Sequence, residues 1–106
     1  MVQEMSAPEL KARRDRGEKL QVVDVREDWE LQLASIPGVV HVPMNQIPAR
    51  LSELSREMPT VVLCHAGARS LRVAHFLENQ GFTGVVNLTG GIAAWSQLVD
   101  ATVPQY

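Results

Sequence analysis

The chain has 106 residues, of which ten are basic and twelve acidic, and it has a single cysteine. This length is typical of one domain, which we expect to span residues 1–106, and the nearly balanced charge argues against nucleic-acid binding, which normally needs a basic face. No run approaches the roughly 18 apolar residues of a membrane helix, and one cysteine cannot form an internal disulfide, so we expect a cytoplasmic protein that does not act at a membrane.

In chain order, the first predicted element is a helix. Ser6-Ala7-Pro8-Glu9 has the form of a capping box with proline in the first turn, and Gly17 is the expected stop. Two apolar runs follow, at residues 20–25 and 39–42. Because these runs are continuous and do not alternate with polar residues, they predict strands buried on both faces, as in a parallel sheet.

The middle of the chain continues the alternation of helices and strands. A helix is predicted to start near Asn45, with one apolar face formed by Leu51, Leu54 and Met58. The apolar run at residues 61–63 predicts a third strand. A helix follows at residues 70–80, closed by Gly81, and its inward side chains are expected to be Leu71, Ala74 and Leu77 or Phe76.

The last predicted strand covers residues 85–88, and the last helix covers residues 91–98 with Trp95 facing the core. Strands that alternate with helices predict an open α/β fold with a parallel sheet. Right-handed crossovers then place the carboxyl ends of the strands along one edge, where ligands of such folds bind. The segments expected at that edge are residues 24–26, 64–70 and 89–91.

Cys64 stands where an apolar strand meets a glycine-bearing loop and then a helix. Backbone N–H groups and a helix dipole at such a place lower the pKa of a thiol and make it a nucleophile, although a buried apolar cysteine is the simpler alternative. The small residues after it let the backbone curl so that its N–H groups point inward at an anion. The candidate binding residues are His65, Ala66, Gly67, Ala68, Arg69 and Ser70.

Charge is unevenly distributed around this loop. No acidic residue occurs between Glu57 and Glu78, whereas that span contains Arg69 and Arg72. The pattern indicates an anionic ligand. Arg69 offers a planar set of donors for an oxyanion, and Ser70 can cap the helix and donate a hydrogen bond to the sulfur.

Four motifs between residues 24 and 95 follow one another in a familiar order. They are Asp24-Val25-Arg26-Glu27 with Glu30, Ile36-Pro37-Gly38 with Pro43, Cys64 to Ser70, and Gly90-Gly91-Ile92-Ala93-Ala94-Trp95. In this combination the chain resembles a small, single-domain member of the rhodanese family of sulfurtransferases. One segment departs from the family: Ala34-Ser35 replaces the usual Gly-His pair, which affects the shape of that loop.

The resemblance implies a three-layer α/β/α fold with a five-stranded, mostly parallel sheet flanked by helices. It also implies a sulfurtransferase that moves a sulfane sulfur from thiosulfate or a similar donor to cyanide or a thiol through a Cys64 persulfide. The loop N–H groups would stabilise the persulfide, and Arg69 would bind the sulfonate end of the donor. No cofactor or metal is required, and a sulfur-relay protein is a further partner to consider.

Two other functions stay open. Cell-cycle phosphatases related to the family place five residues between the cysteine and the arginine, whereas four separate Cys64 from Arg69. The shorter loop favours one sulfur atom over a tetrahedral phosphate, and so disfavours a phosphatase or an arsenate reductase. A non-catalytic rhodanese module for regulation or protein contacts usually lacks the cysteine, which this chain retains.

Other polar residues near the predicted edge have structural explanations. Asp24 and Arg26 are expected to pair and to hold the shape of the site rather than take part in catalysis, and Glu30 to tie down its loop. For His65 we expect the amide to contribute more than the imidazole.

The remaining histidines, His41 and His75, show no ligand spacing with Cys64, which argues against a metal site. Trp29 lies among charged residues and is either a partner contact or a plain surface residue. Arg72 either reaches an anion at the mouth of the loop or is a solvated helix residue.

Overall fold

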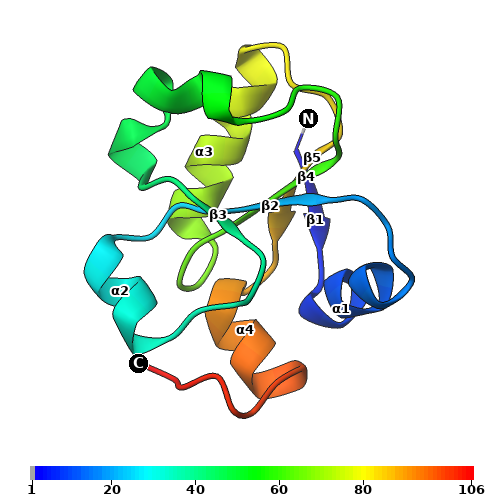
Figure 1. Cartoon of the computed structure of the whole chain (residues 1–106), viewed down its shortest axis with the longest axis vertical. Coiled ribbons are helices and arrows are strands. Elements are labelled where there is room, and N and C mark those ends of the chain that lie inside the picture. The colour runs from blue at the N-terminus through cyan, green and yellow to red at the C-terminus, as the bar shows by residue number, and fades with distance from the viewer. Residues whose placement is uncertain (1) are drawn as a thin grey trace.

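The computed structural model describes residues 2–106, and its five strands form one parallel sheet in the order β1-β5-β4-β2-β3 (Figure 1). The strands are β1 (Gln3–Met5), β2 (Gln21–Asp24), β3 (Val40–His41), β4 (Thr60–Leu63) and β5 (Val85–Leu88). The helices are α1 (Ala7–Asp15), α2 (Asp28–Leu33), α3 (Ala68–Asn79) and α4 (Gly91–Leu98), with two 3₁₀ helices, η1 (Met44–Gln46) and η2 (Pro48–Glu53). The predicted α/β fold is confirmed, and the sheet is parallel throughout.

Helices cover both faces of the sheet and form two apolar layers (Figure 1). In β4, Val61 and Leu63 pack in the layer that α1 and α4 contribute to, whereas Val62 and the following Cys64 pack in the layer of α3 and the 3₁₀ helices. Every residue of β2 and β4 is buried, as the continuous apolar runs predicted. The period of two along a strand therefore directs the Cys64 side chain to the α3 face.

Most helix ends agree with the sequence signals. Ser6 is the N-cap of α1, where its Oγ accepts a hydrogen bond of 3.2 Å from the N–H of Glu9, and the helix ends shortly before Gly17, whose φ is +77°. The α4 bounds are those predicted, and Trp95 is buried. The α3 helix begins at Ala68, two residues earlier than predicted, and Leu71 on it is only half-buried.

Two predictions from the residue pattern differ from the structure. The helix expected from Asn45 is instead the pair η1 and η2, because Pro48 supplies no N–H and Arg50 leaves helical geometry with a φ of −117°. The apolar runs also missed β1, an edge strand of three residues of which Gln3 and Glu4 are exposed. A strand this short shows too little periodicity to be detected.

Candidate active site

Cys64 lies directly after β4, at the bottom of the loop that leads into α3, and only 1% of its surface is exposed. The loop turns at Gly67, which occupies the N-cap position of α3 with a φ of +116°. Because L side chains rarely adopt this conformation, glycine is required for the turn. The turn brings the N–H of Gly67 back toward the residue three positions earlier.

The Cys64 sulfur accepts hydrogen bonds from inside its own loop. The N–H of Gly67 lies 3.1 Å from Sγ, and the hydroxyl oxygen of buried Ser70 lies 3.3 Å from it. Burial acts to raise the pKa of the Cys64 thiol, but the Ser70 hydroxyl and the N–H groups of Ser70, Gly67 and Ala66 outweigh it, so the net pKa is lowered. This is the environment of a nucleophilic cysteine.

The turn between β5 and α4 and the first residues of α4 are hydrogen-bonded to the cysteine loop. The N–H of Ile92 donates to the carbonyl of Cys64 at 2.9 Å, and the N–H of Ala93 donates to the carbonyl of His65 at 3.1 Å. A side chain at Gly91 would place its Cβ 2.6 Å from the His65 carbonyl oxygen and closer still to that of Cys64. The glycine pair of the last sequence motif therefore serves the cysteine loop, which lies much earlier in the chain.

Arg69 forms a two-pronged ion pair with Glu30. Its two terminal nitrogens donate to the two carboxylate oxygens at 2.7 and 2.9 Å. Hydrogen bonding from Arg69 is the main reason why the pKa of Glu30 falls to about 2. Glu30 is buried and Arg69 is half-exposed, so the pair ties α2 to the start of α3 and leaves other N–H groups of the guanidinium free to meet an anion.

Asp24 and Arg26 form a second ion pair, in which neither side chain is exposed. The terminal nitrogen of Arg26 lies 2.8 Å from the Asp24 carboxylate and donates to the carbonyl of Ala34 at 2.9 Å. Arg26 therefore anchors the segment in which Ala34-Ser35 departs from the family pattern. The other terminal nitrogen of Arg26 lies 3.4 Å from the main-chain carbonyl of Glu30, so the two ion pairs are neighbours.

The end of the described chain packs against the site, which the sequence did not indicate. The ring of Tyr106 stacks on His65, with centroids 4.1 Å apart and planes 9° apart. Its hydroxyl donates to Glu30 at 2.7 Å and accepts from Arg26 at 2.8 Å. Trp29, 60% exposed, makes a T-shaped contact with the Tyr106 ring, with centroids 6.4 Å apart. The imidazole of His65 is thus stacked on an aromatic ring.

A second residue missed by the sequence analysis is Asn87 of β5, which is buried and reaches both Ser70 and Gly67. A detectable signal existed, because Asn87 is a polar residue in an otherwise apolar strand. Buried polar side chains are normally hydrogen-bonded, so a polar residue in a central strand points to a specific partner.

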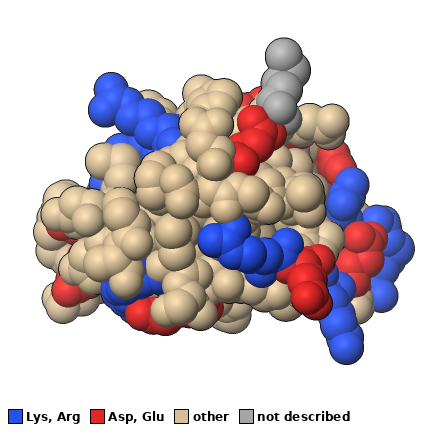
Figure 2. Space-filling view, turned by 90° about the horizontal axis from the view of Figure 1, so that it is seen from above, with Lys and Arg blue, Asp and Glu red and all other residues tan. Residues whose placement is uncertain are grey.

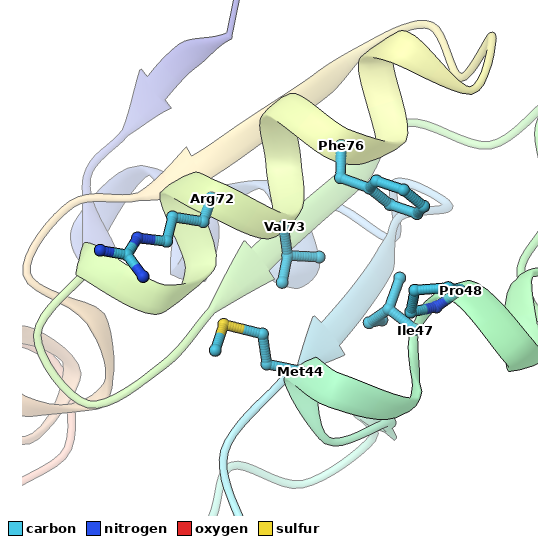
Figure 3. Close-up of a pocket in the computed structure, with 6 residues that line it drawn as sticks. All are labelled: Met44, Ile47, Pro48, Arg72, Val73 and Phe76. Atoms are coloured by element: carbon cyan, nitrogen blue, oxygen red, sulfur yellow. The ribbon is translucent and has the colours of Figure 1, made fainter.

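Arg72 lies beside a pocket of about 190 Å³ between α3 and the 3₁₀ helices. Figure 3 shows Val73 and Met44 in its middle, Phe76 at one end, and Arg72 at the other with its guanidinium directed away from the apolar side chains. The pocket does not include Cys64 or any residue of its loop. Arg72 and Cys64 therefore do not line the same pocket.

Among residues 2–106 no group of three or more metal-ligating side chains comes together, and His41 instead hydrogen-bonds the carbonyl of Arg26 at 2.7 Å. No helix in the same range is long and apolar enough to cross a membrane. Most of the face seen in Figure 2 is uncharged, and toward its right edge basic and acidic side chains lie next to one another.

Comparison with known proteins finds one family. The rhodanese-like domain model matches residues 6–98. A sulfurtransferase of Allochromatium vinosum is 37% identical, and the match covers 92% of this chain and 91% of that protein. The rhodanese-like/PpiC domain-containing protein 12 of Arabidopsis thaliana, a chloroplastic protein, is 44% identical over 84% of this chain, but the chain spans only 31% of its length. A solved rhodanese-like domain protein from Staphylococcus aureus superposes with a TM-score of 0.84, at 33% identity and with 89% and 91% of the two chains covered.

Proposed function

Since this chain belongs to the rhodanese-like domain family, whose relatives at full length include a sulfurtransferase, we propose that it transfers sulfane sulfur from thiosulfate or a similar donor through a persulfide on Cys64. The observation that carries the proposal is the set of donors around the sulfur. The N–H of Gly67 and the hydroxyl of Ser70 reach Sγ inside a loop whose turn requires glycine. Such a cradle stabilises a charged sulfur without a cation in contact with it.

The first half-reaction loads the enzyme. The Cys64 thiolate attacks the outer sulfur of thiosulfate, a new S–S bond forms, and the bond between that sulfur and the sulfonate breaks. Sulfite leaves with the electron pair of the broken bond, and Cys64 carries a terminal, negatively charged sulfur. The backbone N–H groups between His65 and Ser70 stabilise this charge, and the free N–H groups of Arg69 bind the sulfonate of the donor.

The second half-reaction removes the terminal sulfur from the Cys64 persulfide. An acceptor such as cyanide attacks the terminal sulfur and leaves as thiocyanate, and the electron pair of the S–S bond returns to Cys64 as the thiolate. A thiol, either small or carried on a sulfur-relay protein, acts in the same way and becomes a persulfide. Neither half-reaction needs a cofactor, because the atoms and electrons balance between donor, Cys64 and acceptor.

A protein with this chemistry needs its cysteine in the thiol form. We therefore propose a reducing location, with the cytoplasm as the default, for the domain. Trp29 and Tyr106 pack together beside His65 of the loop, and we propose that a protein acceptor contacts this aromatic surface.

The competing functions predict different behaviour. The phosphatases related to this family place five residues between the cysteine and the arginine, whereas four separate Cys64 from Arg69. A purely regulatory module needs no lowered thiol pKa, whereas the pKa of Cys64 is lowered. No observation favours either alternative over sulfur transfer.

The test is the mass of the intact protein after exposure to thiosulfate. We expect a gain of one sulfur atom that cyanide removes and that the Cys64→Ser variant does not show. Well-folded protein that gains no mass with thiosulfate or with a small persulfide donor would refute the proposal. A parallel assay with a generic aryl phosphate identifies a phosphatase, for which turnover without a sulfur adduct is the signature.

A further inference from the structure

Behind the cysteine loop, a chain of polar side chains links the edge strand β1 to the sulfur. The Glu4 carboxylate lies 3.1 Å from the amide nitrogen of Asn87, and the amide oxygen of Asn87 lies 2.5 Å from the hydroxyl oxygen of Ser70. That hydroxyl oxygen is in turn 3.3 Å from Cys64 Sγ. Asn87 and Ser70 are both buried, so each hydrogen bond here has consequences for the others.

The orientation of the Asn87 amide follows from the chemistry of its neighbours. Its nitrogen faces the Glu4 carboxylate and, at 3.2 Å, the carbonyl oxygen of Gly67. Both neighbours only accept hydrogen bonds, so the NH₂ group must be on their side. The amide oxygen is therefore directed at Ser70, and the short contact there has the Ser70 hydroxyl as its donor.

A serine hydroxyl has one hydrogen to donate, but Ser70 has three acceptors within reach. The carbonyl of Gly67 at 3.2 Å and the Cys64 sulfur at 3.3 Å compete with the Asn87 oxygen at 2.5 Å. The shortest contact indicates where the hydrogen rests when the sulfur is neutral. A charged sulfur is the stronger acceptor, since hydrogen bonds to ions are about twice as strong as neutral ones.

We propose that Asn87 is a positioning residue that holds the Ser70 hydroxyl while Cys64 is neutral and releases it to the sulfur when the sulfur carries charge. The loop then offers a hydrogen-bond donor only to the charged form, as thiolate or as persulfide. The thiolate part stands on the geometry alone, and the persulfide part rests on the proposed function. Glu4 acts one step further back, because its carboxylate fixes which way the Asn87 amide faces.

Other charged and titratable groups surround the loop and must stay constant in any test. Arg69 and Glu30 lie at its mouth, where Arg69 feels the charge of Cys64. His65 and Tyr106 stack on each other beside it, and Glu4 stands behind Asn87. Asn87→Leu and Ser70→Ala, the two main variants, add no charge among these groups.

The experiment measures the rate of iodoacetamide alkylation against pH, which reports the apparent pKa of Cys64 because the chain has no other cysteine. Asn87→Leu removes the competing acceptor at similar volume, and we expect the thiol pKa to fall by roughly half a unit to one unit. Ser70→Ala removes the donor, and we expect a rise of similar size. In the Ser70→Ala background, Asn87→Leu should then produce no shift, because there is no hydroxyl left to release.

Two further variants serve as controls. Asn87→Asp keeps the size and strengthens the acceptor, but it also adds a charge beside the Glu4 carboxylate, so only a rise in the thiol pKa that disappears in the Ser70→Ala background supports the inference. Thr89→Val removes a hydroxyl that also binds Glu4, at 2.8 Å, without touching Ser70, and it should change nothing. Urea unfolding establishes that each variant is folded. If Leu and Asp at position 87 shift the thiol pKa in the same direction, or if the Leu shift persists without Ser70, the inference is wrong.

Alkylation needs no sulfur donor, so this test and that of the proposed function fail separately. An intact Ser70-dependent shift in a protein that accepts no sulfur from thiosulfate or a small persulfide would refute the function and leave the positioning role standing. A normal persulfide adduct, with no shift of the thiol pKa in any Asn87 variant, would refute the positioning role and leave the proposed function standing.

Discussion

Gly91→Ala tests whether the turn between β5 and α4 holds the cysteine loop. The added methyl group would stand 2.6 Å from the carbonyl oxygen of His65, at a residue whose φ is +57°. A positive φ costs a non-glycine residue about 1–2 kcal/mol, and forcing a methyl group into packed atoms costs about 1–3 kcal/mol more. We therefore expect Gly91→Ala to lower the free energy of unfolding by about 2–5 kcal/mol.

Gly17→Ala is the matched control, because Gly17 has a φ of +77° but no neighbouring atom within 4 Å of the position that an added methyl group would take. It should lose only the conformational part, about 1–2 kcal/mol. Urea unfolding measures both variants, and iodoacetamide alkylation at about pH 7 measures the state of Cys64 in each. Gly91→Ala should alter the alkylation rate and Gly17→Ala should not. Equal destabilisation, with an unchanged thiol in both, would refute the idea that this turn supports the loop.

The ion pairs behind the loop give two more predictions. Glu30 has a pKa of about 2, below its ordinary value, so its pair with Arg69 stabilises the fold above about pH 4.5, and this contribution is lost as pH falls through 2. Glu30→Gln should therefore cost about 2 kcal/mol at pH 7 and clearly less at pH 3, measured by urea unfolding at both; a gap independent of pH contradicts this. Asp24→Asn leaves the buried charge of Arg26 uncompensated and should cost about 3 kcal/mol in the same assay, and a loss below about 1 kcal/mol would show that the pair is not what neutralises Arg26.

The central strands and the cysteine loop could be predicted because their signals are local. β2 and β4 are buried on both faces, and burial on both faces makes a strand a continuous apolar run. The loop's glycine, small residues and following helix are contiguous with Cys64 in the chain. The helix expected from Asn45 failed for the opposite reason, since the spacing of its leucines was right but Pro48 and the backbone of Arg50 prevented a regular helix.

The contacts that Asn87 and Tyr106 make could not be predicted, because their partners lie in distant segments of the chain. The Tyr106 hydroxyl meets Glu30 across 76 positions, and Asn87 meets Glu4 across 83. No local periodicity encodes such contacts. The tail has no hydrophobic pattern, and β1 is too short to show one, so the residues that steady the site from both ends of the chain emerge only when the chain is folded.

Within the cysteine loop, the groups that contact the sulfur differ from the side chains that face outward. The groups that surround the sulfur are backbone N–H groups and one buried hydroxyl, held by α4 from below and by Asn87 from behind. The side chains of Ala66 and Ala68, in contrast, are exposed. We infer that larger side chains at these two positions leave the lowered thiol pKa intact and instead change which donors and acceptors can approach. On this inference, buried atoms set the chemistry of Cys64, and the exposed positions 66 and 68 set which partners can approach it.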